Sequence, residues 1–144
     1  MHRNPPEVFI MNEQIIIDGA NSVLGRVASF AAKQALLGNK IIIVNCNDLL
    51  ITGRRNLILE NYSQMRRRGK GWFKGPTVPK VPEKLMKRTI RGMLAYTQQR
   101  GEDALDRVIC YNETPKEFES AKKISLVREL KIKTIKLSEI AKII

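Results

Sequence analysis

The chain has 144 residues, of which 43% are hydrophobic and 28% charged, and its formal net charge is +12 at pH 7. These values are typical of one globular domain and exclude a disordered chain or two full-sized domains. No apolar run reaches the roughly 18 to 20 residues of a membrane span, and residues 1–14 carry prolines and charges where a signal peptide would be apolar. We therefore expect a cytoplasmic protein with a single domain over residues 1–144, in which residues 1–12 form a flexible N-terminal extension.

Regular structure is predicted to begin with a strand, a helix and a second strand. Residues 14–18 (QIIID) are a short β-branched run, and residues 22–37 place apolar side chains at helical spacing. Gly38 supplies the helix stop, and residues 40–45 (KIIIVN) are a continuous apolar run that suits a strand covered on both faces. This order implies a right-handed parallel crossover.

The helix predicted over residues 22–37 has two different faces. Its apolar stripe, rich in small residues that suit close packing on a sheet, consists of Leu24, Val27, Ala28, Ala31 and Ala35. The opposite side carries Arg26, Ser29 and Lys33.

The middle of the chain is predicted to form a short strand, a helix and a loop. Residues 49–52 can form the strand, and residues 54–65 the helix. The side chains of this helix that are predicted to face inward are Leu57, Ile58, Tyr62 and Met65. Glycines and prolines predict a long basic loop over residues 66–81.

The last part is predicted to contain a long helix, a strand and two short helices. Pro82 suits the first turn of a helix that runs to about Gln99, and residues 107–111 (RVICY) predict a buried strand. Residues 114–117 (TPKE) match a capping box and predict a short helix there. Ser138 is a candidate cap for a final helical turn.

Positive charge is concentrated in residues 54–91, which hold twelve Lys and Arg residues and two acidic ones, a net of +10. Since the rest of the chain is close to neutral, this segment is a patch that indicates a polyanionic partner, with nucleic acid as the first candidate. Its RNA-binding candidates, two loop aromatics included, are Arg54, Arg55, Arg66, Arg67, Arg68, Lys70, Trp72, Phe73, Lys74, Lys80, Lys84, Lys87, Arg88 and Arg91.

The helix after Pro82 is predicted to expose a cationic ridge. Its basic side chains are three, four and seven residues apart and share one stripe, formed by Lys84, Lys87, Arg88 and Arg91. A separate apolar stripe is formed by Met86, Ile90, Met93 and Thr97. The four like charges repel one another, and an opposing polyanion would relieve that repulsion. The alternative is a solvated basic face without a ligand.

The loop before that helix mixes arginines, glycines and the adjacent aromatics Trp72 and Phe73. Arginine binds phosphate oxygens in a bidentate manner, glycine permits close backbone approach, and an aromatic ring stacks on an unpaired base. The combination suits structured RNA better than duplex DNA, which is read in its major groove. The alternative role of Trp72 and Phe73 is to anchor the loop on the body of the protein.

The turn that starts at Gly19 is the alternative functional site. Residues 19–26 (GANSVLGR) lie between a strand and a helix, as phosphate-binding loops do, but contain neither GK[ST] nor GxGxxG. Gly25 is predicted to lie where the helix packs closely. A nucleic-acid-processing enzyme or nucleotide-dependent factor that uses this turn is the second hypothesis, and a DNA-architectural protein is the third.

The sequence offers no recognisable set of catalytic or metal-binding residues. The single histidine, His2, lies in the predicted extension, and Cys46 and Cys110 are isolated thiols within apolar segments. Both cysteines are predicted to be small core residues. We therefore expect no catalytic residues, no metal, no cofactor and no small-molecule substrate.

Several motifs give the chain a family resemblance over about residues 15–111. They are DGA at 18–20, LGRVAS at 24–29, GP at 75–76 with Pro79, RTIRGML at 88–94, and RG at 100–101 with AL at 104–105. The chain thereby resembles the archaeal and eukaryotic type of large-subunit ribosomal protein thirteen. Ala95 stands where that family usually has proline, and residues 112–114 replace a glycine-containing turn.

The resemblance implies a three-layer α/β/α fold around a small, mostly parallel sheet of about four strands. It implies a structural component of the large ribosomal subunit that acts early in assembly and is not an enzyme. Its implied partners are large-subunit rRNA and neighbouring ribosomal proteins, with no membrane contact. Among the RNA-binding candidates, Arg26, Arg88 and Arg91 are carried over from the family motifs.

Overall fold

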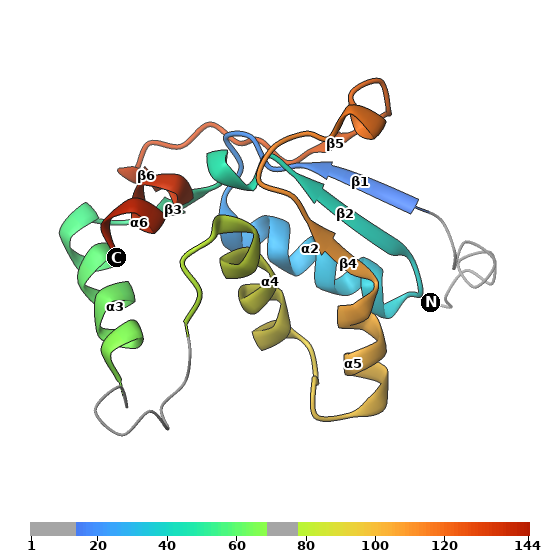
Figure 1. Cartoon of the computed structure of the whole chain (residues 1–144). Helices are drawn as coiled ribbons and strands as arrows, with labels where there is room; N and C mark the ends of the chain where they lie inside the picture. The colour runs from blue at the N-terminus through green and yellow to red at the C-terminus, as the bar shows by residue number, and fades with distance from the viewer. Residues whose placement is uncertain (1–13, 69–77) are drawn as a thin grey trace, which may run out of the picture.

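A computed structural model describes residues 14–68 and 78–144, arranged as Figure 1 shows. The elements in chain order are β1 (Gln14–Asp18), α2 (Leu24–Leu36), β2 (Lys40–Val44), η1 (Cys46–Asp48), β3 (Leu50–Thr52), α3 (Arg55–Arg67), α4 (Pro82–Met93), α5 (Gln99–Asp106), β4 (Val108–Cys110), η3 (Lys116–Phe118), β5 (Ile124–Ser125), β6 (Thr134–Lys136) and α6 (Leu137–Ile143). The predicted N-terminal extension and the centre of the predicted basic loop lie outside the described residues.

The central sheet has four parallel strands in the order β4-β2-β1-β5. Strand β2 occupies an inner position, where β1 pairs with it residue for residue, Ile16 opposite Ile42. The chain moves from β1 to β2 to β4 in one direction, and right-handed crossovers then place the connecting helices on the same face. Helices α2, α4 and α5 do pack together on one face of the sheet (Figure 1).

Alternate residues of the inner strands face two different layers, as the two-residue period of a strand requires. Ile17, Ile41 and Ile43 are fully buried in the main core beneath the helices. Ile16, Ile42 and Val44 face the other layer, where Tyr111 and Phe118, the last residue of η3, pack against them. The predicted three-layer α/β fold with a mostly parallel sheet is confirmed, although a short 3₁₀ turn rather than a long helix covers the second face.

Helix α2 has the two faces that its sequence predicts. All five residues of its predicted apolar stripe are buried, and Arg26, Ser29 and Lys33 are exposed. Gly38 ends the helix with φ +98°, a conformation that glycine adopts without strain. The prediction that Gly25 packs closely is wrong, because this glycine is exposed and a β-carbon there would meet nothing within 4 Å.

A second, two-stranded sheet lies beside α3 and α6. The predicted strand at residues 49–52 exists as β3, but it pairs antiparallel with β6 rather than joining the central sheet. Helix α6 follows β6 directly and inserts Leu137 and Ile140 into the core. Its N-cap residue is Lys136, which makes no side-chain cap, so the prediction of a Ser138 cap is wrong.

The long helix predicted to run to Gln99 ends earlier, at Met93. Leu94 leaves the helical conformation because its side chain is buried in the core, and a separate helix, α5, begins at Gln99. The predicted apolar stripe is therefore only half correct. Met86 and Ile90 are fully buried, whereas Met93 is 46% exposed and Thr97 is exposed outside the helix.

Two further predictions are corrected by side-chain contacts. The Thr114 hydroxyl donates a hydrogen bond to Asn45 Oδ1 at 2.9 Å, so it caps no helix, and the predicted short helix is the single turn η3. In α3, Ile58 is buried and Tyr62 and Met65 pack against the core, as predicted. Leu57 is 53% exposed, so the prediction that it faces inward is wrong.

Gly101 packs against the connection between α4 and α5, and its replacement should be costly. A β-carbon at this position would overlap the backbone of Ala95 in the connection between the two helices. Gly101→Ala should lower the free energy of unfolding by about 1–3 kcal/mol, measured by urea denaturation. Gly92→Ala is the matched control, since this exposed helical position has free space. It should raise stability by about 0.5–1 kcal/mol, and equal losses at the two sites would contradict the predicted role of Gly101.

Candidate nucleic-acid interface

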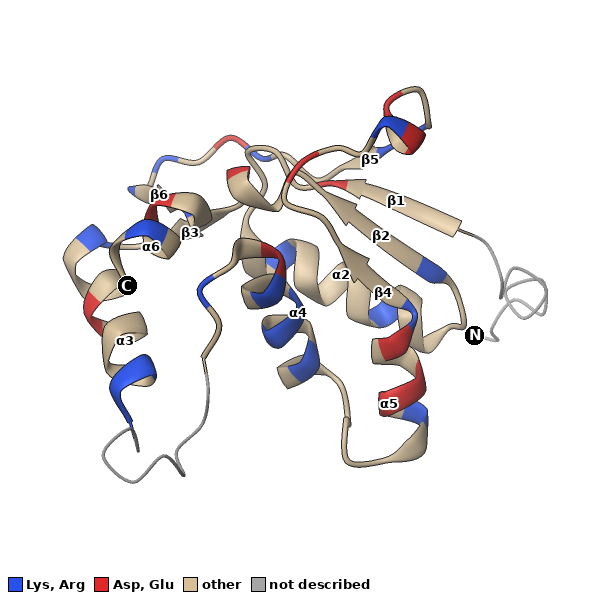
Figure 2. Ribbon diagram, in the orientation of Figure 1, with Lys and Arg blue, Asp and Glu red and all other residues tan. Residues whose placement is uncertain are grey.

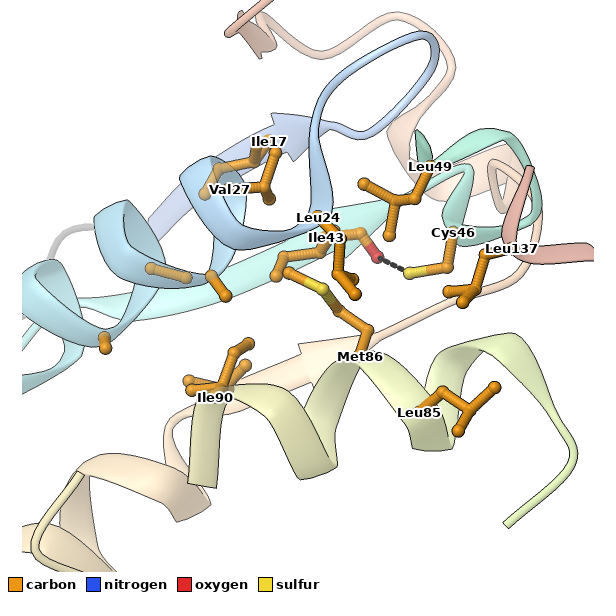
Figure 3. Packing of buried hydrophobic residues seen from close by; sticks show 14 of the residues in the cluster. Ile17, Leu24, Val27, Ile43, Cys46, Leu49, Leu85, Met86, Ile90 and Leu137 are labelled. Carbon is orange, nitrogen blue, oxygen red and sulfur yellow. Dashed lines mark hydrogen bonds between the residues drawn. The ribbon is translucent and has the colours of Figure 1, made fainter. Parts of the chain in front are cut away.

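The cationic ridge exists on α4 and is held in place by the opposite face of the same helix. Pro82 occupies the first turn, and the Glu83 N–H donates to Asn112 Oδ1 at 2.9 Å. The inward face buries Leu85, Met86 and Ile90, and Figure 3 shows Met86 reaching toward Ile43 of the sheet. The outward residues Lys84, Lys87, Arg88 and Arg91 are exposed or half-buried. Figure 2 shows their positive charge gathered along α4.

The four ridge residues line a groove with a volume of about 310 Å³, and Pro79 and Leu105 are the other described residues in its lining. Neither ion pair found in the described part of the chain involves a ridge residue. Four cations beside a partly apolar floor can receive the phosphates and sugars of a nucleic-acid strand. We call this hollow the α4 groove and take it as the candidate binding site.

One aromatic residue beside the ridge cations was not among the predicted RNA-binding residues. Tyr96 lies in the connection after α4, and the Arg91 guanidinium stands over its ring at 5.0 Å from the centroid. Tyr62 of α3 lies near Arg88: burial raises the pKa of the Tyr62 hydroxyl, and the charge of Arg88 partly opposes that rise. Tyr96 was missed because the sequence placed it inside a continuous helix.

Arg66, a predicted RNA-binding residue, makes hydrogen bonds that connect distant segments of the protein. Its Nε donates to the Val78 carbonyl oxygen at 3.3 Å and its Nη1 to the Ile144 backbone oxygen at 3.0 Å. It thus ties the end of α3 to the segment before α4 and to the end of α6. Arg67 and Arg68 are exposed, and Arg67 makes one long bond, 3.4 Å, to Ser63 of its own helix.

Replacing Arg66 should therefore affect stability more than replacing its neighbour. Arg66→Met removes two hydrogen bonds from a charged donor and should lower the free energy of unfolding by about 1–3 kcal/mol. Arg67→Met is the matched control and should change it by less than about 0.5 kcal/mol. Thermal or urea unfolding of both variants provides the measurement. Equal losses in the free energy of unfolding would show that the hydrogen bonds of Arg66 do not stabilise the fold.

The remaining described candidates lie in two other basic hollows. Arg54 and Arg55 line one of about 370 Å³ together with Lys133, and Arg55 also pairs with Glu139 at 2.9 Å. Lys80 lines another of about 540 Å³ together with Lys142. Lys133 and Lys142 were missed, because they are distant in sequence and only the packing of β6 and α6 brings them beside the patch.

Three groups of predicted residues have other outcomes. Arg26 is exposed on α2 but does not line the α4 groove. Lys70, Trp72, Phe73 and Lys74 lie outside the described residues, so their roles remain predictions. The prediction of a small core residue is correct for Cys46, which is a buried free thiol, while Cys110 is a half-buried free thiol. The neighbouring Cys110 thiol, together with burial, raises the pKa of the Cys46 thiol well above its usual range.

The turn that follows β1 is filled by protein contacts. The N–H groups of residues 19–22 donate to Val44 O, Asp18 Oδ1, Asp48 O and Gly19 O at 2.9–3.2 Å. A phosphate-binding loop needs such groups to be free. A β-carbon on Gly19 would lie 3.0 Å from the Val44 oxygen, so the glycine serves close packing. The geometry does not favour a nucleotide site here.

Metal-binding and membrane-spanning features can be assessed in residues 14–68 and 78–144. No group of three or more His, Cys, Asp or Glu side chains in these ranges could hold a metal ion. Likewise, none of the helices in these ranges is long and apolar enough to cross a membrane.

Comparison with known proteins agrees with the motifs in the sequence. The family described as ribosomal protein L13 matches residues 12–117. The chain belongs to the ribosomal protein L13 family. This match contains the whole of α4 and its groove, whereas Lys133 and Lys142 lie beyond it.

Individual L13 family members from archaea are similar over most of their length. The large ribosomal subunit protein uL13 of Methanosarcina barkeri is 43% identical over 112 residues, which cover 77% of this chain and 79% of that protein. The uL13 proteins of Haloarcula marismortui and Natronomonas pharaonis are 40% and 39% identical, and each alignment covers 88% of both chains. The resemblance inferred from the motifs is therefore confirmed.

Proposed function

We propose that the protein is a structural constituent of the large ribosomal subunit and binds large-subunit rRNA. The observation that carries this proposal is the α4 groove, in which Lys84, Lys87, Arg88 and Arg91 line one hollow without an acidic partner among its described lining residues. Membership of the ribosomal protein L13 family and the large-subunit names of its archaeal relatives support it. Its partners are large-subunit rRNA and neighbouring ribosomal proteins, and its location is the cytoplasmic large subunit.

The basic residues divide this binding between several surfaces. The ridge contributes a rigid row of cations, because its inward face is fixed in the core. The basic residues that follow α3 and the hollows with Arg54, Arg55 and Lys80 extend the contact. Several phosphate contacts made by one folded body would stabilise a particular RNA arrangement, which suits a role in early subunit assembly.

The proposal is tested by the salt dependence of binding to a fragment of large-subunit rRNA. If about six phosphates are contacted, the logarithm of the association constant should fall with the logarithm of salt concentration with a slope of about 4 to 5. A much shallower slope would refute RNA binding through the patch. Equal affinity for duplex DNA in direct competition would favour the DNA-architectural hypothesis instead. Co-sedimentation with large subunits tests the location.

A further inference from the structure

An exposed aromatic ring lies at the end of the cationic ridge. Tyr96 is 49% exposed, and the Arg91 guanidinium covers part of its ring at 5.0 Å from the centroid. Arg91 also lines the α4 groove. The ring is therefore next to the row of cations, and about half of its surface remains open to a ligand.

The backbone that carries Tyr96 is held on both sides. Before it, Leu94 is buried in the core, and the Tyr96 N–H donates to the Leu94 oxygen at 2.9 Å. After it, the Gln98 N–H donates to the Ala95 oxygen at 2.9 Å, and Ala95 packs so closely on Gly101 that no side chain fits at that glycine. A ring on such a fixed turn loses little conformational freedom when it binds.

A tyrosine ring and an arginine plane are the two side-chain surfaces on which nucleobases stack. We propose that Tyr96 and Arg91 form a stacking site for one unpaired nucleobase, with phosphates of the same strand held in the α4 groove. This inference rests on the proposed rRNA binding and adds a base contact to it. The neighbouring cations favour a nucleotide over an apolar protein segment, because the base arrives attached to the anions that the groove holds.

Replacement of the ring separates stacking from charge. Tyr96→Leu should weaken binding to a large-subunit rRNA fragment about tenfold while leaving the salt slope unchanged, since no cation is lost. Tyr96→Phe should keep the wild-type affinity. Met93→Leu is the matched control, because Met93 lies three residues before Tyr96 and is similarly exposed. This substitution should leave the RNA affinity unchanged. Unchanged melting temperatures would show that the fold is intact.

A spectroscopic measurement tests the contact directly. Trp72 is the single tryptophan of the chain, so Tyr96→Trp combined with Trp72→Phe leaves one indole at position 96. Its fluorescence should be quenched when the RNA fragment is added, and an RNA in which unpaired bases are replaced by abasic sites should not quench it.

The outcomes distinguish the two proposals. Salt-dependent binding by the wild type with equal affinity of Tyr96→Leu, or without quenching, would overturn the stacking site alone. A weaker affinity with a smaller salt slope would also overturn it, because the ring would then act only by holding Arg91. Absence of salt-dependent RNA binding by the wild type would overturn the proposed function itself.

Discussion

Replacing Lys84, Lys87, Arg88 and Arg91 together with glutamine should lower the affinity for large-subunit rRNA roughly a thousandfold at 0.1 M salt. This value assumes that each of the four residues contacts one phosphate and that each contact contributes about 0.7–0.9 to the salt slope. The slope itself should therefore fall by about 3 to 4. Binding titrations at several salt concentrations would provide both values. The fold should remain, since the ridge residues are exposed or half-buried and repel one another.

A variant with the same loss of charge elsewhere provides the control. Lys40, Lys116, Lys122 and Lys131 are all exposed and lie outside the α4 groove. Their joint replacement with glutamine also removes four positive charges, but it should change the salt slope by less than about 1. If both quadruple variants bound RNA equally well, net charge rather than the ridge would be responsible for binding.

Ile90→Asp should have the largest effect on stability. Ile90 is fully buried on the inward face of α4, beside Met86 and the alanines of α2. An aspartate there removes apolar packing and buries a carboxyl group without a partner, which should lower the free energy of unfolding by at least about 3–5 kcal/mol. Urea denaturation followed by circular dichroism measures the loss.

The same substitution three residues later tests the assignment of the two faces. Met93 is on the same helix but 46% exposed, so Met93→Asp should cost less than about 1 kcal/mol. A continuous helix with Met93 in its core stripe, as the spacing alone predicts, would make the two substitutions comparably damaging. A comparison of the stability losses of Ile90→Asp and Met93→Asp therefore tests whether α4 ends just before Leu94.

Local patterns were sufficient for the elements whose structure is decided by neighbours in sequence. The runs at residues 14–18 and 40–45 and the alanine-rich stripe between them predicted β1, β2 and α2 correctly, because burial on fixed faces requires those periods. The same spacing argument placed the four ridge residues along one groove.

Features that depend on distant contacts could not be predicted in this way. The end of α4 is decided by the burial of Leu94 and by the contact between Ala95 and Gly101. Strand β3 pairs with β6, more than 80 residues later. The role of Arg66 depends on oxygens of Val78 and Ile144, which a count of charges does not include.

The position of α6 has a consequence for the timing of folding during synthesis. This helix is translated after every other described element, yet Leu137 and Ile140 fill the core next to η1, α3 and α4. A nascent chain that lacks residues 137–143 leaves Leu49 without its cover, because the Leu137 N–H also donates to the Leu49 oxygen at 2.8 Å. Closure of the core, and with it the final placement of the basic hollow between α4 and α6, must therefore wait until that segment has left the exit tunnel.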